Sequence, residues 1–234
     1  YTVPVDQWSA IQECNKTFSH SRSGMNIRSE HNWRGRLPAD SHLRIYAVGT
    51  PIEAYCIVKH KVDFWVPQEI EEFVWTTQRS YEAMLMFFRQ LGINKSKIKW
   101  TEPSDSPYHA KYWDYSSEAT MKRPTMYRVL DVPAALRLLQ TTESGSFSIK
   151  VSDPDISENN GPWLVTFSAD GVTVEPTDSA DLEADIQQFT QGFMGEPSFA
   201  QLATNGLIKV NNENGLKAAC ALMPHSPTMC LEFF

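Results

Sequence analysis

The chain has 234 residues, of which 41% are hydrophobic, enough to bury one large core or two ordinary ones. It has no apolar run of about 18 residues and no charged-then-apolar leader among its first thirty residues, so we expect no membrane span, no secretory signal and a cytoplasmic location. Residues 1–140 hold 18 Lys and Arg against 15 Asp and Glu, a net of +3, whereas residues 141–234 hold 3 against 13, a net of −10. An acidic part argues against a nucleic-acid partner and is compatible with a cationic substrate, although a merely solvated acidic face explains the charge equally well.

The first part of the chain predicts a mixed α/β domain. Its expected elements are a first helix capped by Asp6, a hairpin of strands over 42–49 and 53–62, strands over 69–76, 96–102 and 126–132, and helices over 78–91 and 133–140. Helix, hairpin, strand, helix and strand in this order are typical of a mixed sheet covered by helices.

The second part predicts an α+β domain. Strands are expected over 145–153, 161–176 with a turn at Asp170-Gly171, and 181–186, followed by helices over 186–195, 197–206 and 213–224 and a final strand. We expect an antiparallel sheet with helices on one face. The break in charge falls at a polar, Gly-containing stretch over 141–146, which predicts two domains, 1–140 and 141–234.

The usual catalytic and metal-binding motifs are absent from the sequence. It contains no GxSxG, GxxxxGK[ST], HExxH or GxGxxG. The six histidines are isolated, which argues against a metal site, and the four cysteines lack metal spacing and predict reduced, mostly buried thiols, namely Cys14, Cys56, Cys220 and Cys230.

Two places carry candidate functional side chains. Arg28, Glu30, His31 and Trp33 lie close together in "SGMNIRSEHNW", although a surface segment with Trp33 docked on the core is the simpler interpretation. Asp131 interrupts the apolar run "YRVLDVPAAL"; the spacing favours a cap for the following helix, and a carboxylate facing a cleft between the domains is the alternative.

The order of these segments resembles the enhanced intracellular survival (Eis) family of acetyl-CoA-dependent N-acetyltransferases. Residues 1–140 are similar to the second, GNAT-like domain of that family through "GMNIRSEHNW", "IYAV", "AYCIVK" and "YRVLDVPAAL". Residues 141–234 are similar to its C-terminal domain, which has the sterol carrier protein fold, through "FSIKVSDPDISENNGPWLVTF", "DLEADIQQFTQGFMG", "FAQLATNGLIKV" and "LEFF".

The resemblance implies an acetyltransferase whose C-terminal carboxylate is the general base. The matching group is the α-carboxylate of Phe234, and the rings of Phe233 and Phe234 are suited to anchor it and to exclude water. Burial would raise the low pKa of an ordinary α-carboxyl, about 3.3–3.7, toward a useful range. The family also implies that Trp33 lines the amine pocket and that Asp131 and Glu232 hold substrate ammonium groups, with Phe233 beside them.

One departure from the family concerns acetyl-CoA. The segment "EFVWTTQRSYEAM" has no glycine between its strand and its helix, so it lacks a phosphate-binding turn. This predicts either the C-terminal fragment of a longer enzyme or a natural chain that has lost catalysis. The start of the chain at Tyr1 favours the fragment, inactive by itself, with acetyl-CoA bound by a domain absent from this chain.

The acceptor implied is an amine of a polycationic small molecule, such as an aminoglycoside, or a lysine, and the assembly implied is a hexamer. A non-catalytic lipid-binding module is the alternative, with Phe189, Phe193, Met194 and Phe199 lining an apolar tunnel, although side chains at this spacing are more often core. An oligomerisation module is a third possibility.

Overall fold

The computed structural model describes residues 1–38, 42–121 and 125–232. These form two compact units: residues 1–117 with 229–234 make the first, and residues 118–228 make the second. The division falls ahead of the boundary expected after residue 140, because α5 (Val132–Arg137) buries Val132 and Leu136 in the core of the second unit. The last residues of the chain belong to the first unit, which the change in charge does not reveal.

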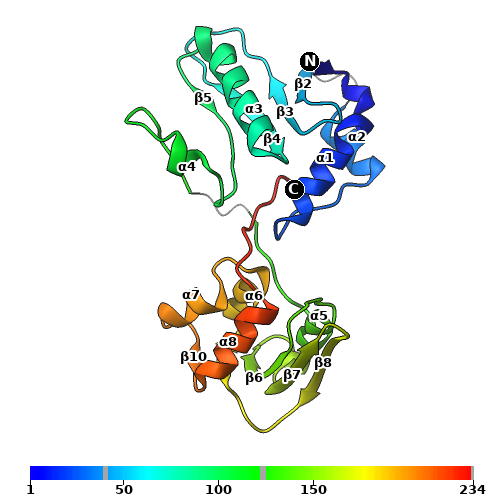
Figure 1. Ribbon diagram of the computed structural model, residues 1–234, viewed down its shortest axis with the longest axis vertical. Coiled ribbons are helices and arrows are strands. Elements are labelled where there is room, and N and C mark those ends of the chain that lie inside the picture. The colour runs from blue at the N-terminus through cyan, green and yellow to red at the C-terminus, as the bar shows by residue number, and fades with distance from the viewer. Residues whose placement is uncertain (39–41, 122–124, 233–234) are drawn as a thin grey trace. The chain divides into compact units, whose positions relative to one another are not determined.

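The first unit contains a five-stranded mixed sheet of order β1-β2-β3-β4-β5 (Figure 1). Strands β1 to β4 pair antiparallel and β5 pairs parallel to β4. Its elements are β1 Thr2–Val3, η1 Val5–Gln7, α1 Ser9–His20, α2 Glu30–Arg36, β2 Leu43–Val48, β3 Ala54–Lys59, β4 Gln68–Trp75, α3 Gln78–Leu91, η2 Gly92–Asn94, β5 Ile98–Lys99 and α4 Tyr108–Lys111.

The hairpin and the helix over 78–91 are where the sequence predicts them. In contrast, Asp6 is not the cap of the first helix: it lies inside the 3-10 turn η1, and α1 begins only at Ser9. The strand expected over 126–132 is absent, because the amides of Val129 and Val132 donate to Thr190 Oγ1 and Asn159 Oδ1 instead of to a neighbouring strand.

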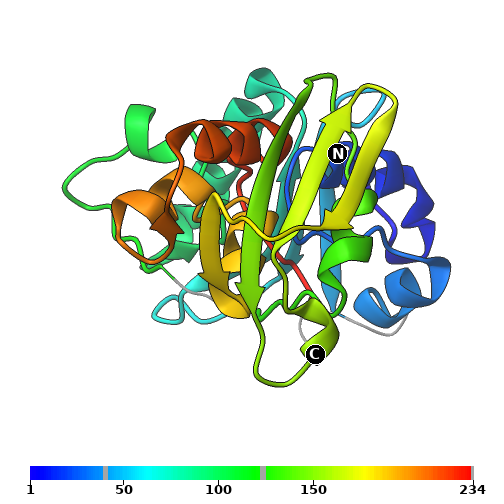
Figure 2. The same ribbon diagram turned by 90° about the horizontal axis from the view of Figure 1, so that it is seen from below.

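The second unit contains a five-stranded sheet of order β10-β9-β6-β7-β8, and strands of this sheet lie side by side in Figure 2. Helix α8 packs against β6 and α5 against β8. Besides α5, its elements are β6 Gly145–Ser152, η3 Ser157–Asn159, β7 Trp163–Ser168, β8 Gly171–Pro176, β9 Leu182–Asp185, α6 Ile186–Met194, α7 Phe199–Thr204, β10 Lys209–Val210 and α8 Glu213–Leu222.

Two expectations for this unit are wrong. Its sheet is not purely antiparallel, since β9 returns to lie parallel to β6, a direction that alternation within a strand does not encode. The expected final strand is also absent from the described residues: after α8 the chain to Glu232 has only a single β-bridge residue, Thr228, and the Met229 amide donates to the Ser23 carbonyl.

The thiols follow the expectation that they are reduced and mostly buried. All four cysteines are free, and Cys14 and Cys56 are buried. Burial raises the pKa of both buried thiols to about 12, so they remain protonated at neutral pH.

A glycine ends α6 in a conformation that other residues avoid. Gly195 has φ +92°, and a Cβ there would lie 2.7 Å from the Ser226 amide nitrogen. Gly206 also has a positive φ, +67°, but a Cβ would meet nothing within 4 Å. Alanine substitutions at Gly195 and Gly206 therefore separate the cost of backbone strain from the cost of steric crowding.

We expect Gly195→Ala to destabilise the protein more than Gly206→Ala. Both substitutions lower the free energy of unfolding by about 1–2 kcal/mol because of the left-handed conformation. Gly195→Ala lowers it by about 1–3 kcal/mol more because the backbone must move. Urea unfolding of the two variants measures the difference. Equal losses would show that the segment around Ser226 yields without cost.

Candidate functional site

A buried ion pair joins the segment between α1 and α2 to the central sheet of the first unit. Arg28 Nη1 and Nη2 donate to Glu72 Oε1 and Oε2, each at 2.8 Å. The side chains are 1% and 0% exposed, respectively. Two parallel hydrogen bonds fix the guanidinium plane relative to the carboxylate, a geometry that lysine cannot reproduce.

Each of the two charges offsets the energetic cost of burying the other. Burial favours the neutral form of Glu72, but the adjacent Arg28 outweighs it and holds the pKa of this carboxyl below its usual value. Burial likewise opposes the charge of Arg28, yet Glu72 raises the guanidinium pKa above its usual value. Removal of either partner from such a pair typically costs about 3–5 kcal/mol, so the pair is a rigid part of the unit.

Three polar side chains complete the surroundings of Glu72. The Tyr55 hydroxyl donates to Glu72 Oε1 at 2.5 Å and accepts from Asn15 Nδ2 at 2.9 Å. Arg36 Nε donates to Glu72 Oε2 at 3.3 Å. Burial and then the charge of Glu72 raise the pKa of Tyr55 well above its usual value, so it remains a donor.

Trp33 forms an apolar wall of this cluster. It is fully buried, its ring stacks on Trp8 at 5.9 Å between centroids, and the Arg28 guanidinium lies 4.6 Å from its ring centroid. Its Nε1 has no hydrogen-bond partner among the described residues. Docking of Trp33 on the core is thus confirmed, whereas Glu30 and His31 are exposed on α2 and do not join the cluster.

The C-terminal segment, drawn red in Figure 1, belongs to the same unit. Met229 and Leu231 are buried in the core of the first unit, while Cys230 and Glu232 between and after them are half-buried. Glu232 Oε1 accepts from Arg28 Nε at 2.6 Å. Arg28 is therefore hydrogen-bonded through all three of its side-chain nitrogens.

Within the part of the chain that the structure describes, this cluster pairs cations with anions and can hold a chain segment. Arg28 and Arg36 face Glu72 and Glu232, two cations against two anions. Because Glu232 is already paired with Arg28, its charge is neutralised where an ammonium group of a substrate was expected. The arrangement can anchor the chain end beside a fully buried aromatic ring.

The start of α3 does not fit the pyrophosphate of acetyl-CoA. Thr77 Oγ1 accepts from the Ser80 amide and Ser80 Oγ accepts from the Thr77 amide, so the helix start is closed by its own side chains. Thr77 Oγ1 also donates to the Glu53 carboxylate at 2.8 Å, which places a negative charge where a phosphate would need to bind. The sequence-based expectation that this turn lacks a phosphate cradle agrees with this geometry.

Asp131 lies in the second unit and caps a helix. Its Oδ1 accepts from the Ala134 amide at 2.9 Å, which confirms the capping interpretation for α5. The side chain is exposed, and its Oδ2 accepts no hydrogen bond from the described residues.

The aromatic side chains proposed for a lipid tunnel pack against one another. Phe189 and Phe199 are fully buried, and Phe189 contacts the rings of Phe193 and Phe199 at 6.1 and 6.2 Å between centroids. A Cβ on Gly192 would lie 2.6 Å from the Phe199 ring. These residues act as core, the interpretation that their spacing favoured.

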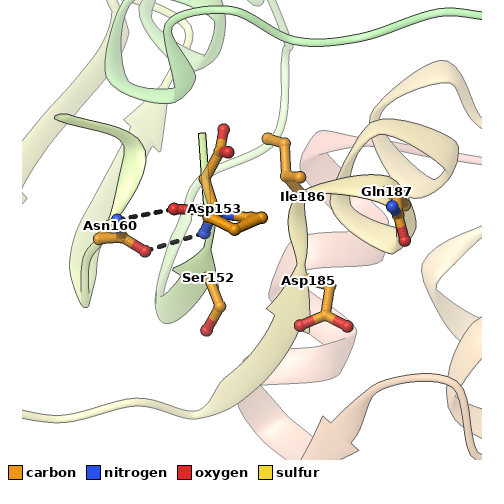
Figure 3. A pocket seen from close by; sticks show the side chains of 7 residues that line it. Ser152, Asp153, Asn160, Asp185, Ile186 and Gln187 are labelled. Atoms are coloured by element: carbon orange, nitrogen blue, oxygen red, sulfur yellow. Dashed lines mark hydrogen bonds between the residues drawn. The ribbon is translucent and has the colours of Figure 1, made fainter. Parts of the chain in front are cut away.

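A hollow of about 450 Å³ lies on the second unit between the end of β6 and the start of α6 (Figure 3). Asp153 and Asn160 on one side are joined by two hydrogen bonds, and Asp185 and Gln187 lie on the other side. Asp153 also accepts from Arg128 Nη2 at 2.6 Å. Because Asp153 is held by protein groups, we assign the hollow no ligand.

Several expectations concern absences or lie outside the described residues. Phe233 and Phe234, the proposed pocket residue and base, lie outside them. Within residues 1–38, 42–121 and 125–232, no group of three or more His, Cys, Asp and Glu side chains is arranged to hold a metal ion. The helices of this part of the chain are all too short or too polar to cross a membrane.

Removal of the Tyr55 hydroxyl tests how much the cluster stabilises the first unit. We expect Tyr55→Phe to lower the free energy of unfolding by about 1–3 kcal/mol, because Asn15 loses its buried acceptor and Glu72 loses a donor. Tyr46→Phe is the matched control, since Tyr46 makes its hydrogen bond to His60 at the surface. Equal unfolding midpoints for the two variants would contradict the expectation.

Two known domain families each match one part of the chain. Residues 24–129 match the acetyltransferase (GNAT) domain, and residues 132–231 match the sterol carrier protein domain. An uncharacterized N-acetyltransferase of Streptomyces avermitilis is 26% identical over 170 residues, which cover 70% of this chain and 40% of that protein.

Solved structures show the same fold. A GCN5-related N-acetyltransferase from Anabaena variabilis has a TM-score of 0.85 at 16% identity, over 100% of this chain and 62% of that one. Eis1 from Mycobacterium abscessus has a TM-score of 0.70 at 19% identity, over 95% of this chain and 60% of that one. The chain thus spans less than two thirds of the length of each of these relatives. The expected fold class is confirmed: a GNAT-like mixed α/β fold is followed by a sterol carrier protein-like α+β domain.

Proposed function

We propose that this chain acts as the C-terminal part of an Eis-like, acetyl-CoA-dependent N-acetyltransferase. In this proposal the α-carboxylate of Phe234 is the general base and accepts a proton from the acceptor ammonium group, which leaves a nucleophilic amine. Acetyl-CoA would supply the acetyl group from a domain absent from this chain, because the start of α3 does not fit its pyrophosphate.

The single observation that carries the proposal is the docking of the C-terminal segment in the GNAT-like unit. Met229 and Leu231 are 6% and 5% exposed, and Glu232 is paired with the buried Arg28. An end that served only to terminate the chain would gain nothing from such anchoring and would ordinarily fray. Anchoring within two residues of the end supports a role for the terminal group.

The acceptor in this proposal is a cationic amine, either on a polycationic small molecule or on a lysine. The match to a GNAT domain supports an amine, and the net charge of −10 over residues 141–234, from 3 basic and 13 acidic residues, supports a cation. Asp131 offers an exposed carboxylate oxygen for an ammonium group, and the resemblance to the Eis family favours Phe233 as a further substrate contact. Trp33 and Glu232 would affect the bound acceptor only indirectly, through their contacts with Arg28.

The remaining parts of the proposal concern assembly and location. By resemblance to the Eis family, the complete enzyme would be a cytoplasmic homo-oligomer, a hexamer. The described chain alone would release no CoA, because it has no fitting site for the donor.

Deletion of Phe234 from the longer enzyme that contains this chain tests the base. We expect the deletion to lower kcat for amine-dependent CoA release by about 10²–10⁴-fold, the usual contribution of a general base. Addition of one glycine after Phe234 keeps both rings but moves the carboxylate, so it should lower kcat by a similar factor. The measurement uses a thiol reagent with neomycin or spermine as acceptor, and Glu30→Gln on the exposed face of α2 is the control.

The outcomes are distinct. If the longer enzyme is active and neither the deletion nor the added glycine changes kcat, the terminal carboxylate is not the base. If the enzyme releases no CoA with any amine while the chain is folded, the acetyltransferase proposal itself fails.

A further inference from the structure

The buried cluster around Arg28 has no role in the proton transfer proposed above, although it is costly to build. A guanidinium that is 1% exposed needs hydrogen-bond acceptors for its N–H groups. Glu72 of β4 accepts from it, and Tyr55 of β3 in turn donates to Glu72 and accepts from Asn15 of α1.

The guanidinium has one orientation. The Glu72 carboxylate accepts hydrogen bonds from both terminal nitrogens of Arg28, and the Tyr55 hydroxyl fixes that carboxylate by donating to it. Because the guanidinium is planar, this leaves Nε facing a single direction, and Glu232 Oε1 lies there at 2.6 Å. The position of Glu232 is thus set by groups of the central sheet.

The segment before Glu232 is held independently. The Met229 amide donates to the Ser23 carbonyl at 3.0 Å, and Met229 and Leu231 alternate inward with Cys230 and Glu232. A shift of one residue would turn Met229 and Leu231 away from the core and carry Glu232 away from Arg28. The ion pair between Arg28 and Glu232 therefore forms only in the observed register of residues 229–232.

The distance from this anchor to the chain end is short. Phe234 is two residues after Glu232, so its Cα lies at most about 7 Å from that of Glu232.

We propose that Arg28 is the positioning residue of the C-terminal segment, and that it sets the register and the place of the chain end through Glu232. Glu72 and Tyr55 hold Arg28 for this task. The effect on catalysis rests on the proposed function, but the docking itself does not. Glu232 would then be an anchor of the chain and not a contact of the substrate ammonium.

Release of the terminal residues by carboxypeptidase A, which removes C-terminal aromatic residues, tests the docking without any need for activity. In the chain as described, Glu232→Gln removes the charge of a side chain that is 16% exposed and lies at the chain end, so the fold should persist. We expect Phe234 to be released at least about tenfold faster than from the native chain. Glu30→Gln, which removes an exposed pairing with Arg34, should leave the rate unchanged.

A second variant separates positioning from loss of structure. Arg28→Lys keeps a cation but cannot pair with Glu72 through two nitrogens and with Glu232 through a third, so it should also speed release. Thermal unfolding of each variant monitors the fold. If Glu232→Gln and the control release Phe234 at equal rates, the anchor proposal is wrong.

The longer enzyme then links the anchor to catalysis. Glu232→Gln should lower kcat for CoA release at least about tenfold and leave KM for acetyl-CoA unchanged, because the donor does not bind this cluster. If deletion of Phe234 leaves kcat intact while Glu232→Gln still speeds carboxypeptidase release, the general-base proposal fails and the anchor stands. If release is unaffected while the deletion abolishes activity, the anchor fails and the base stands.

Discussion

A buried guanidinium must satisfy its donors, and this requirement organises the first unit. Arg28 lies in an irregular segment, yet its partners come from β4 and from the chain end, 44 and 204 residues away along the sequence. Neutralisation by Glu72 alone would leave Nε without an acceptor, and a buried unpaired donor costs about 1–3 kcal/mol. The C-terminal segment supplies that acceptor through Glu232, so the buried site and the segment that ends at Glu232 meet at one side chain.

Much of the fold follows from local patterns. Helix α3 was expected over the residues where it lies, because its apolar spacing and its final glycine agree, and the hairpin of β2 and β3 follows from two apolar runs around a turn. The strand expected over 126–132 fails for a nonlocal reason: Thr190 and Asn159 take the backbone donors that a ladder would need. The parallel pairing of β6 with β9 is nonlocal as well.

The site was predictable in part. Resemblance pointed to Trp33 and Glu232, and both contact Arg28. Arg28 is one of the candidate functional side chains of "SGMNIRSEHNW", although the simpler interpretation of that segment places it at the surface with only Trp33 docked. Glu72 carried a usable signal: it shares one face of β4 with Ile70 and Val74, both buried, so alternation places its carboxylate inside. A buried acid of this kind requires a buried cation, and Arg28 was the missing half.

The two matched domains thus differ in what they contribute. The GNAT-like unit closes the start of α3 with Thr77, Ser80 and Glu53, and it also holds the C-terminal segment up to Glu232. The second unit keeps a filled aromatic core and supplies the residues that lead the chain back to the first.

Amide hydrogen exchange at Met229 in the native chain tests the docking most directly, because this amide donates to Ser23 only when the segment is bound. Burial of Met229 and Leu231, each worth about 1.5–3 kcal/mol, predicts exchange more than about tenfold slower than in an unfolded peptide. Exchange at the unfolded rate, while the amides of β3 stay protected, would contradict the account.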